Sequence, residues 1–228
     1  MAGSSRAFKD TVYQHFARLG KAVASAKRLE LLDILCQGPR TVEVLAQQAE
    51  ISLANASQHL QILRAARLVD AEKQGLYVEY RLADDEVLRF FLALRELATQ
   101  RLSEIETVTR EYFEQRSAME SIGSEELLRR IRAGEVVVLD VRPVEEYQAG
   151  HLPEAISIPL KELRNRFGEL PRGRTVVAYC RGPYCVMSLE AVEILRDAGR
   201  KAQRLEVGVP DWVARGLPLA SGPGGSRP

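Results

Sequence analysis

The sequence has 228 residues, of which 46% are hydrophobic and 28% charged; this excludes a disordered chain and suits one large domain or two of ordinary size. Its apolar runs are much shorter than the roughly 20 residues that a membrane-spanning helix needs, and residues 1–10 lack the apolar stretch of a secretory signal. The three cysteines, Cys36, Cys180 and Cys185, are too few for a disulfide framework. We therefore expect a cytoplasmic protein without a membrane partner, whose thiols are candidates for chemistry.

The formal net charge is +1, and residues 1–81 carry 11 Lys and Arg against 8 Asp and Glu. This mildly basic balance permits nucleic-acid binding without showing it.

The first half of the chain is predicted to be mostly helical. Apolar residues recur every three or four positions in the first two helices, and Thr41 and Ser52 are suitable N-caps for the next two. The four expected helices cover residues 8–19, 27–36, 42–49 and 53–66. Alternating apolar residues then predict a β-hairpin over 68–82 with its turn at Lys73-Gln74-Gly75. One long helix is expected over 84–116, with an apolar stripe suited to packing against another helix.

From about residue 120 the pattern changes to strands that alternate with helices. Ser124 is a suitable cap for the first of these helices. The expected elements cover residues 124–134, 136–141, 175–180 and 187–198. Strands alternating with helices predict an α/β domain with a parallel sheet. We therefore predict a multidomain protein, with a mostly α-helical (α+β) winged helix-turn-helix domain at residues 1–117, an α/β domain at residues 118–228, and a disordered tail rich in Gly, Pro and Ser.

Two short helices separated by a tight turn and followed by a hairpin have the order of a winged helix-turn-helix. The helix over 53–66 is long enough to lie in the major groove, and its first turns are polar. Polar side chains there and in the hairpin are suited to contact base edges and phosphates. The candidate DNA-binding residues are Asn55, Ser57, Gln58, His59 and Gln61 in the helix, and Lys73 and Gln74 in the wing. The alternative is a helical domain with a polar face and no role in DNA binding.

The same region resembles the ArsR/SmtB family of bacterial winged-helix repressors. The matching residues are Val44-Leu45-Ala46, Ser52, Ser57-Gln58-His59-Leu60, Leu63, Leu68-Val69 and Tyr80-Arg81-Leu82. The resemblance covers roughly residues 10–105. It implies a homodimer formed by the first and last helices of the domain, and operator DNA with half-sites one helical turn apart.

The ligands of the family's metal sensors are missing from this sequence. The helix over 42–49 has no cysteine, and the helix over 84–116 has no histidine, so we expect no metal site in this half. Cys36 resembles one of the two thiols of the family's persulfide-sensing branch, which makes it a possible redox residue. The second thiol, expected near Leu102, is absent, and a packed core cysteine is the alternative.

Cys180 is the candidate nucleophile of the second half. It follows an apolar strand and precedes a short loop and a helix, and ligands bind at this end of the strands in open parallel sheets. Backbone N–H groups at a helix N-terminus lower the pKa of a thiol and favour the thiolate. The loop that would surround it consists of Arg181, Gly182, Pro183, Tyr184, Cys185 and Val186.

Residues 120–219 resemble a single-domain rhodanese, a sulfurtransferase. The matching residues are Leu139-Asp140-Val141-Arg142, Glu145-Glu146-Tyr147, Gly150-His151-Leu152-Pro153-Glu154-Ala155, Ile158-Pro159, the Cys180 loop, Gly208, Trp212 and Gly216-Leu217-Pro218. The resemblance implies that Cys180 takes the outer sulfur of a donor such as thiosulfate or polysulfide as a persulfide and passes it to a thiol or cyanide, without a cofactor. It also implies that the loop amides hold the persulfide's charge and that Asp140 and Arg142 form an ion pair that braces the loop.

Two residues of the loop depart from the rhodanese pattern. Cys185 stands where many rhodaneses have an arginine, and Pro183 removes one amide from the loop. Arg181 is the substitute that we expect to contact an anionic donor. Cys185 either resolves a Cys180 persulfide or sulfenate into a disulfide or polysulfide link, or fills the base of the loop as a small residue.

Together the two halves predict a dimeric transcriptional regulator, a repressor, that handles or senses sulfane sulfur. One alternative is a thiosulfate or polysulfide sulfurtransferase whose helical half serves for dimerisation or autoregulation. Another is a non-enzymatic module that binds a partner protein.

Overall fold

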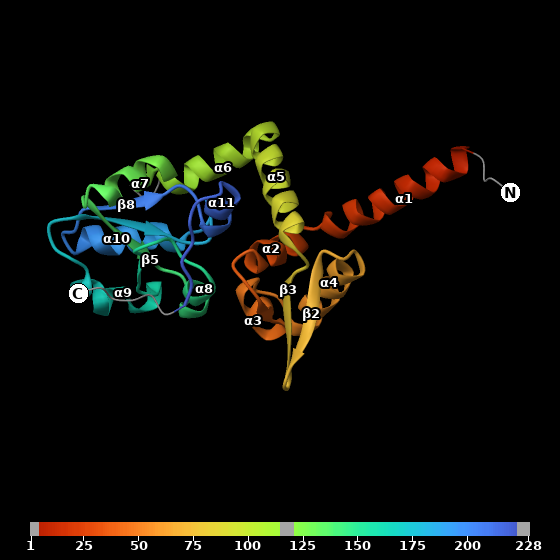
Figure 1. Cartoon of the computed structure of the whole chain (residues 1–228), viewed down its shortest axis with the longest axis horizontal. Coiled ribbons are helices and arrows are strands. Elements are labelled where there is room, and N and C mark those ends of the chain that lie inside the picture. The colour runs from red at the N-terminus through yellow and green to blue at the C-terminus, as the bar shows by residue number, and fades with distance from the viewer. Residues whose placement is uncertain (1–4, 115–120, 223–228) are drawn as a thin grey trace. The chain divides into compact units, whose positions relative to one another are not determined.

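The computed structural model describes residues 5–114 and 121–222, which separate into two compact units, Met1–Phe91 and Leu92–Pro228 (Figure 1). The expected domain boundary at 117/118 and the last six residues of the expected tail lie outside the described residues. Within the described ranges, no helix is both long and apolar enough to cross a membrane.

The first unit is a winged helix-turn-helix, as predicted. Its elements are α1 (Ser5–Val23), α2 (Ala26–Leu35), β1 (Arg40–Thr41), α3 (Val42–Gln48), α4 (Leu53–Ala65), β2 (Val69–Gln74), β3 (Tyr77–Leu82) and the first part of α5 (Asp85–Arg101). The strands pair antiparallel in the order β1-β3-β2. Both expected caps are present: Val44 N–H donates to Thr41 Oγ1 (3.5 Å) and Asn55 N–H donates to Ser52 Oγ (3.2 Å). These caps satisfy amides that the first turn of each helix leaves unpaired.

The hairpin turn lies one residue later than predicted. Lys73 pairs with Val78 and Gln74 with Tyr77 in the strand ladder, so Gly75 and Leu76 make the turn. Gly75 takes a φ of +62°, a conformation that Lys and Gln avoid because of their Cβ. Leu76 therefore lies at the tip and is 96% exposed instead of joining the alternating strand face.

The prediction of a single long helix over 84–116 is wrong. The structure has two helices, α5 and α6 (Ser103–Glu114), which separate at Leu102. The charges fit this break, because Arg101 lies in the last turn of α5 whereas Glu104 and Glu106 lie in the first turn of α6. A positive charge is favourable at the C-terminal end of a helix dipole, and negative charges are favourable at the N-terminal end.

The second unit contains the α/β fold that was predicted. It begins with the second part of α5 and includes the whole of α6. Its further elements are β4 (Ser121–Ile122), α7 (Ser124–Arg132), β5 (Val136–Asp140), α8 (Val144–Ala149), β6 (Ile156–Ser157), α9 (Leu160–Arg166), a 3-10 turn (Phe167–Glu169), β7 (Thr175–Tyr179), α10 (Met187–Asp197), β8 (Ala202–Leu205) and α11 (Val209–Ala214). The strands form a parallel sheet in the order β4-β8-β7-β5-β6.

One helix cap in this unit differs from the prediction. Gly123 is the N-cap of α7, and Ser124 is the first helical residue. The Ser124 hydroxyl is buried and accepts a hydrogen bond from Arg215 (3.1 Å), so a contact with a distant residue takes the place of the local cap.

Helices cover both faces of the parallel sheet. Val136 and Val138 of β5 belong to a core with residues of α7, α8 and α11, whereas Val137 and Leu139 belong to a core with residues of α9 and α10. This division follows from the alternation of side chains along a strand. Because β7 is the central strand, Cys180 lies at the middle of the sheet's carboxyl edge.

Candidate functional sites

Cys180 lies where the sequence predicted, between the end of β7 and the loop that leads to α10. Its side chain is buried, with 2% of the residue exposed. Its Sγ donates to the Cys185 carbonyl (3.5 Å) and to Ser188 Oγ (3.4 Å). The loop is folded back by a hydrogen bond from Cys185 N–H to the Gly182 carbonyl (3.1 Å). This bond closes a β-turn with Pro183 in its second position, which suits the fixed φ of proline.

The two loop thiols differ in acidity, and Cys185 is the more acidic. Burial raises the pKa of the Cys180 thiol well above its ordinary value. The neighbouring Cys180 thiol and the backbone N–H groups of Arg181 and Met187 favour the Cys185 thiolate, and they lower the pKa of Cys185 to about 7 despite its burial. The sequence predicted the thiolate at Cys180, whereas in the structure the lowered pKa belongs to Cys185.

Asp140 and Arg142 form the expected ion pair. Arg142 Nη2 lies 2.7 Å from Asp140 Oδ2, and both side chains are fully buried. Arg142 also donates to the Gly150 carbonyl (2.7 Å), and the Tyr179 hydroxyl donates to Asp140 (2.5 Å). The pair thus holds the turn at Gly150 and the residue that precedes Cys180.

Glu146 is a loop contact that the sequence reasoning missed. Its buried carboxylate accepts hydrogen bonds from Arg181, the closest at 2.6 Å. Arg181 was the expected contact for an anionic donor, and in the structure its Nε and Nη2 bind this carboxylate. The motif Glu145-Glu146-Tyr147 was the available signal, but its spacing does not reveal which loop residue it meets.

Gly208, directly before α11, packs on the backbone of the Cys180 loop. A Cβ placed on Gly208 would lie 2.0 Å from the Arg181 carbonyl oxygen and 2.6 Å from Gly182 N. Only a residue without a side chain allows this approach. Gly208 N–H in turn donates to Asp211 Oδ2 (3.2 Å).

Arg204 is a second residue that the sequence reasoning missed. It lies on β8, and it donates to the Pro183 carbonyl (3.3 Å) with its guanidinium 4.4 Å from the centre of the Phe113 ring. Burial lowers the pKa of Arg204, whereas the charges of Cys180 and Cys185 oppose that change. Its Nε is buried and has no hydrogen-bond partner among the described residues. Arg204 therefore supplies positive charge beside the loop, although its place in the sequence carries no motif.

The Cys180 loop and α11 also contact α5 within the second unit. The Tyr184 hydroxyl lies 2.7 Å from Thr99 Oγ1, and Arg95 forms an ion pair with Asp211. Tyr184 therefore connects the Cys180 loop to a helix that starts in the first unit.

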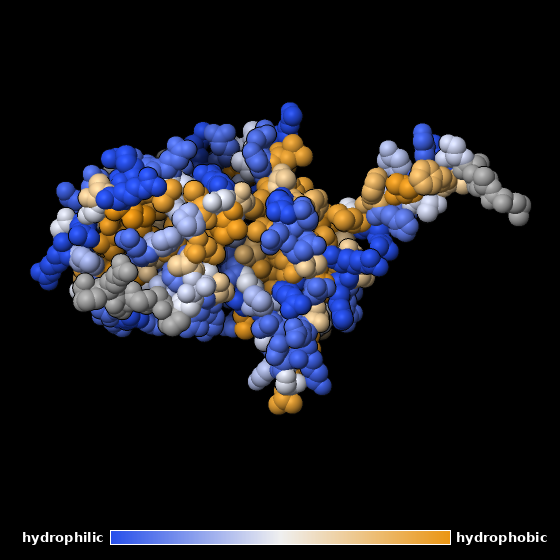
Figure 2. Space-filling view, in the orientation of Figure 1, coloured by the Kyte–Doolittle hydropathy of each residue, from blue (hydrophilic) through white to orange (hydrophobic). Residues whose placement is uncertain are grey.

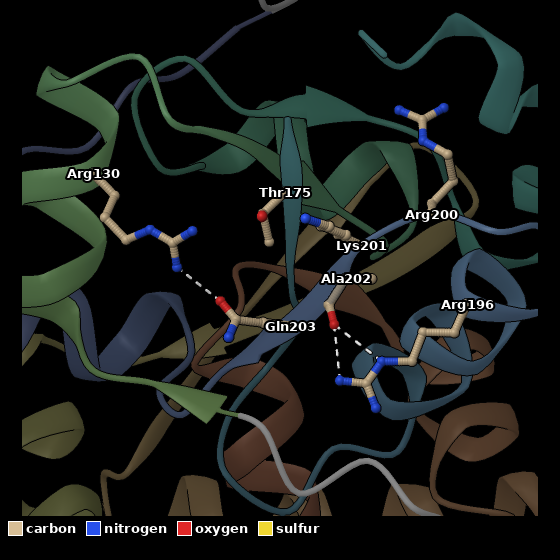
Figure 3. A pocket seen from close by; sticks show the side chains of 7 residues that line it. All are labelled: Arg130, Thr175, Arg196, Arg200, Lys201, Ala202 and Gln203. Atoms are coloured by element: carbon tan, nitrogen blue, oxygen red, sulfur yellow. Dashed lines mark hydrogen bonds between the residues drawn. The ribbon is translucent and has the colours of Figure 1, made fainter. Parts of the chain in front are cut away.

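A separate hollow of about 420 Å³ lies at the opposite end of β7 (Figure 3). Its arginines bind backbone and amide oxygens: Arg196 donates to the Ala202 carbonyl, Arg130 to Gln203 Oε1, and Arg200 to carbonyls of residues 167–171. These contacts tie helix ends to strands, and Cys180 does not line the hollow. We assign it a structural role.

The α4 helix presents part of the predicted DNA-contact surface. Ala56, Leu60 and Leu63 are buried as expected. Of the candidate residues, Asn55, Gln58, Gln61, Lys73 and Gln74 are exposed, whereas Ser57 and His59 are half-buried. His59 Nδ1 is buried without a hydrogen-bond partner in the described part of the chain, so its ring is less available to DNA than that of an exposed residue.

The α1 helix carries an uncovered apolar face. Phe8 is 69% exposed and Phe16 is 65% exposed, and Tyr13 and Leu19 are also exposed. Figure 2 shows hydrophobic side chains along this helix. Cys36, at the C-cap of α2, is half-buried and is not part of a disulfide.

Comparison with known proteins agrees with both halves of the structure. Residues 25–71 match the family described as bacterial regulatory protein, arsR family, and residues 124–215 match the rhodanese-like domain. The HTH-type transcriptional regulator Rv0324 of Mycobacterium tuberculosis is 45% identical over 222 residues, 97% of each chain. A sulfurtransferase of Allochromatium vinosum is 32% identical over 102 residues, 44% of this chain and 94% of that one. The homodimeric winged helix-turn-helix domain of a possible ArsR-family regulator from Mycobacterium bovis is 40% identical, and the match covers 45% of this chain and 94% of that chain with a TM-score of 0.41.

The folds of the two units and the Cys180 loop define a winged helix-turn-helix protein that also carries a rhodanese-like domain. The resemblances inferred from the sequence are confirmed for both halves. Since the identity to a regulator extends over nearly the whole chain, the chain belongs to the arsR family of bacterial transcriptional regulators, in a form with a rhodanese-like domain.

Proposed function

We propose that this chain is a cytoplasmic repressor in which Cys180 forms a persulfide, and that this persulfide changes the affinity of the protein for its operator. The observation that carries the proposal is the hydrogen bond between Tyr184, in the Cys180 loop, and Thr99 of α5 (2.7 Å). A change in the loop is thereby transmitted to a helix whose first residues belong to the DNA-binding unit.

The loading step uses a donor such as thiosulfate or polysulfide. Cys180 gives up its proton to solvent, and its thiolate attacks the outer sulfur of thiosulfate. The sulfur–sulfur bond of the donor breaks, sulfite leaves, and the persulfide carries the remaining negative charge. The backbone N–H of Ser188 and the nearby Arg204 guanidinium favour that charge. A thiol acceptor attacks the outer sulfur and restores Cys180.

Sulfur loading needs a physical route to the DNA-binding unit if it is to regulate. The persulfide is larger than the thiol, and Cys180 is buried in a loop that packs on Gly208. The added sulfur therefore displaces the loop, and Tyr184 and Asp211 transmit the shift to Thr99 and Arg95. A coupling of this kind amounts to about 1–3 kcal/mol in affinity.

The homodimer is part of the proposal. The apolar face of α1 is exposed in one chain, and exposed apolar patches of this kind mark interfaces between proteins. Two α4 helices related by a two-fold axis would read two operator half-sites.

The proposal is tested by measuring operator binding before and after polysulfide treatment. DNA upstream of the protein's own gene serves as the probe, at fixed salt concentration because the affinity depends strongly on salt. We expect polysulfide to weaken binding by the wild-type protein about 5- to 150-fold, and to leave binding by Cys180→Ser unchanged. A Cys180→Ser protein that still responds would contradict sensing through Cys180. Thiosulfate:cyanide activity in a protein that binds no upstream DNA would favour the sulfurtransferase alternative.

A double-mutant cycle isolates the route through α5. Tyr184→Phe and Thr99→Val each remove one partner of the hydrogen bond, and we expect each to reduce the response to polysulfide while sulfur still loads on Cys180. The double variant should add little to either single change if the two residues act through the same bond. Full responses in both single variants would contradict this route.

A further inference from the structure

We propose that Cys185 resolves the Cys180 persulfide by closing a Cys180–Cys185 disulfide and expelling hydrosulfide, so that the chain reduces sulfane sulfur to sulfide at the expense of its own thiols. This inference rests on the proposed Cys180 persulfide. It adds a second reaction to the site, because sulfur transfer as proposed above needs only one cysteine.

The geometry of the loop brings the two thiols together. The Cys180 Sγ donates to the Cys185 carbonyl at 3.5 Å, and the two thiols are close enough for each to shift the pKa of the other. The β-turn closed by Cys185 N–H and the Gly182 carbonyl (3.1 Å) directs the chain back toward Cys180. Pro183 restricts this turn and reduces the number of conformations in which the thiols are apart. A disulfide between them would therefore close over a short, already folded segment.

Cys185 has the environment of an attacking thiolate. The backbone N–H groups of Arg181 and Met187 bind its sulfur, and the Arg181 charge adds to their effect. Together with the Cys180 thiol they lower the pKa of Cys185 to about 7, so much of it is thiolate at neutral pH. Thiols with a pKa near the ambient pH are the most effective in exchange at sulfur. Cys185 is also more exposed than Cys180, so reductants reach the resulting disulfide from its side.

The reaction balances without a further reagent. The Cys185 thiolate attacks Cys180 Sγ, the inner sulfur of the persulfide. The bond between Sγ and the outer sulfur breaks, and the outer sulfur takes a proton from water and leaves as HS⁻. The sulfane sulfur is reduced to sulfide, and the two cysteine thiols are oxidised to a disulfide. Two molecules of a low-molecular-weight thiol then restore the loop by exchange through a mixed disulfide.

The experiment uses full-length, reduced protein and thiosulfate in the absence of oxygen. Thiosulfate is chosen because its transfer to Cys180 releases sulfite, so any sulfide comes from the second step. Sulfite, sulfide and intact mass are followed together, and the cysteine peptides are mapped. We expect the wild-type protein to release sulfite and an equal amount of sulfide, and to end as a Cys180–Cys185 disulfide with no added sulfur.

The variants separate the two steps. Cys185→Ser and Cys185→Ala should release sulfite, keep the mass of one extra sulfur atom on Cys180, and release no sulfide until an external thiol is added. Circular dichroism checks that each variant is folded. Cys36→Ser is the matched control, since Cys36 belongs to the other unit, and it should behave as the wild type does.

Two results would overturn the inference in distinguishable ways. A wild-type protein that releases sulfite but keeps its extra sulfur, as the Cys185 variants do, contradicts the resolving role and leaves the Cys180 persulfide intact. A protein that releases neither sulfite nor sulfide, with or without Cys185, contradicts the proposed persulfide and the inference with it.

Discussion

Replacing Gly208 by alanine tests how tightly the Cys180 loop is held. The new Cβ would lie 2.0 Å from the Arg181 carbonyl oxygen and 2.6 Å from Gly182 N. Gly208 has a φ of −101°, which alanine adopts readily, so the cost is steric only. The loop backbone would have to move by about 1 Å to bring the closest contact to 3.0 Å. Overpacking of this size costs about 1–3 kcal/mol.

The expected effects are on both stability and chemistry. Thermal unfolding of Gly208→Ala, followed by calorimetry, should show Tm lowered by roughly 3–12 °C at about 3–4 °C per kcal/mol. Thiosulfate:cyanide sulfurtransferase activity should fall by about 100-fold, because a shift of about 1 Å misplaces the reacting sulfur. Gly168→Ala is the matched control: its Cβ meets nothing within 4 Å in the described part of the chain, and its φ is not left-handed. That change should be neutral or stabilise the protein by up to about 1 kcal/mol. Wild-type Tm and activity in Gly208→Ala would refute the close contact.

Three further predictions follow from the described contacts. Asp140→Asn should lower the free energy of unfolding by about 3–5 kcal/mol, because it leaves the Arg142 charge buried without its counter-ion; urea unfolding measures this. Alkylation of Cys185 should rise with pH about a midpoint near 7 and be lost as the pH falls below it, because only the thiolate reacts. Cys180→Ala should raise that midpoint, because it removes the S–H donor. Gln58→Ala should weaken operator binding by about 1–3 kcal/mol if the exposed side chain contacts a base, as measured by fluorescence anisotropy.

Each of these predictions has its own control. Glu126→Gln removes an exposed ion pair with Arg129 and should cost less than about 1 kcal/mol; an equal loss for Asp140→Asn would contradict the buried-pair argument. An unchanged Cys185 midpoint in Cys180→Ala would show that the Cys180 thiol does not lower the pKa of Cys185. Lys73→Ala should weaken binding to every DNA sequence alike and reduce the salt dependence, whereas an equal loss on all sequences for Gln58→Ala would exclude a base contact.

Local patterns in the sequence predicted the first four helices and the hairpin, and in the second unit α7, β5, β7 and α10, but not β1, β4, α8, β6, α9, β8 or α11. Thr41 and Ser52 precede apolar helices and cap them, because capping depends only on residues three positions apart. Alternating residues predicted the two strands of the wing, and apolar runs predicted the buried strands β5 and β7 of the rhodanese-like half. The break at Leu102 was missed, because apolar residues keep a helical spacing on both sides of it and the competing charge signal at Arg101 and Glu104 is weaker.

The site was only partly predictable. The position of Cys180 after a buried strand and before a helix identified the loop, because ligand sites in parallel sheets lie at that edge. The residues that meet this loop come from other strands and helices: Glu146 from α8, Arg204 from β8 and Gly208 before α11. None of the three is within 20 positions of Cys180 in the chain. Their contacts with the loop therefore cannot be predicted from the spacing of residues near Cys180.

The sequence by itself therefore determined the first four helices and the hairpin, the elements α7, β5, β7 and α10, the two-part architecture and the cysteine loop, since these depend on residue spacing and on backbone preferences. Only the tertiary structure decided which residues surround the loop and which of its thiols is the more acidic. Acidity depends on which sulfur receives hydrogen bonds and which donates them. Here burial raises the pKa of Cys180, whereas the Cys180 thiol and two backbone amides lower the pKa of Cys185. That arrangement arises only when the carboxyl edge of the sheet and the start of α10 are brought together.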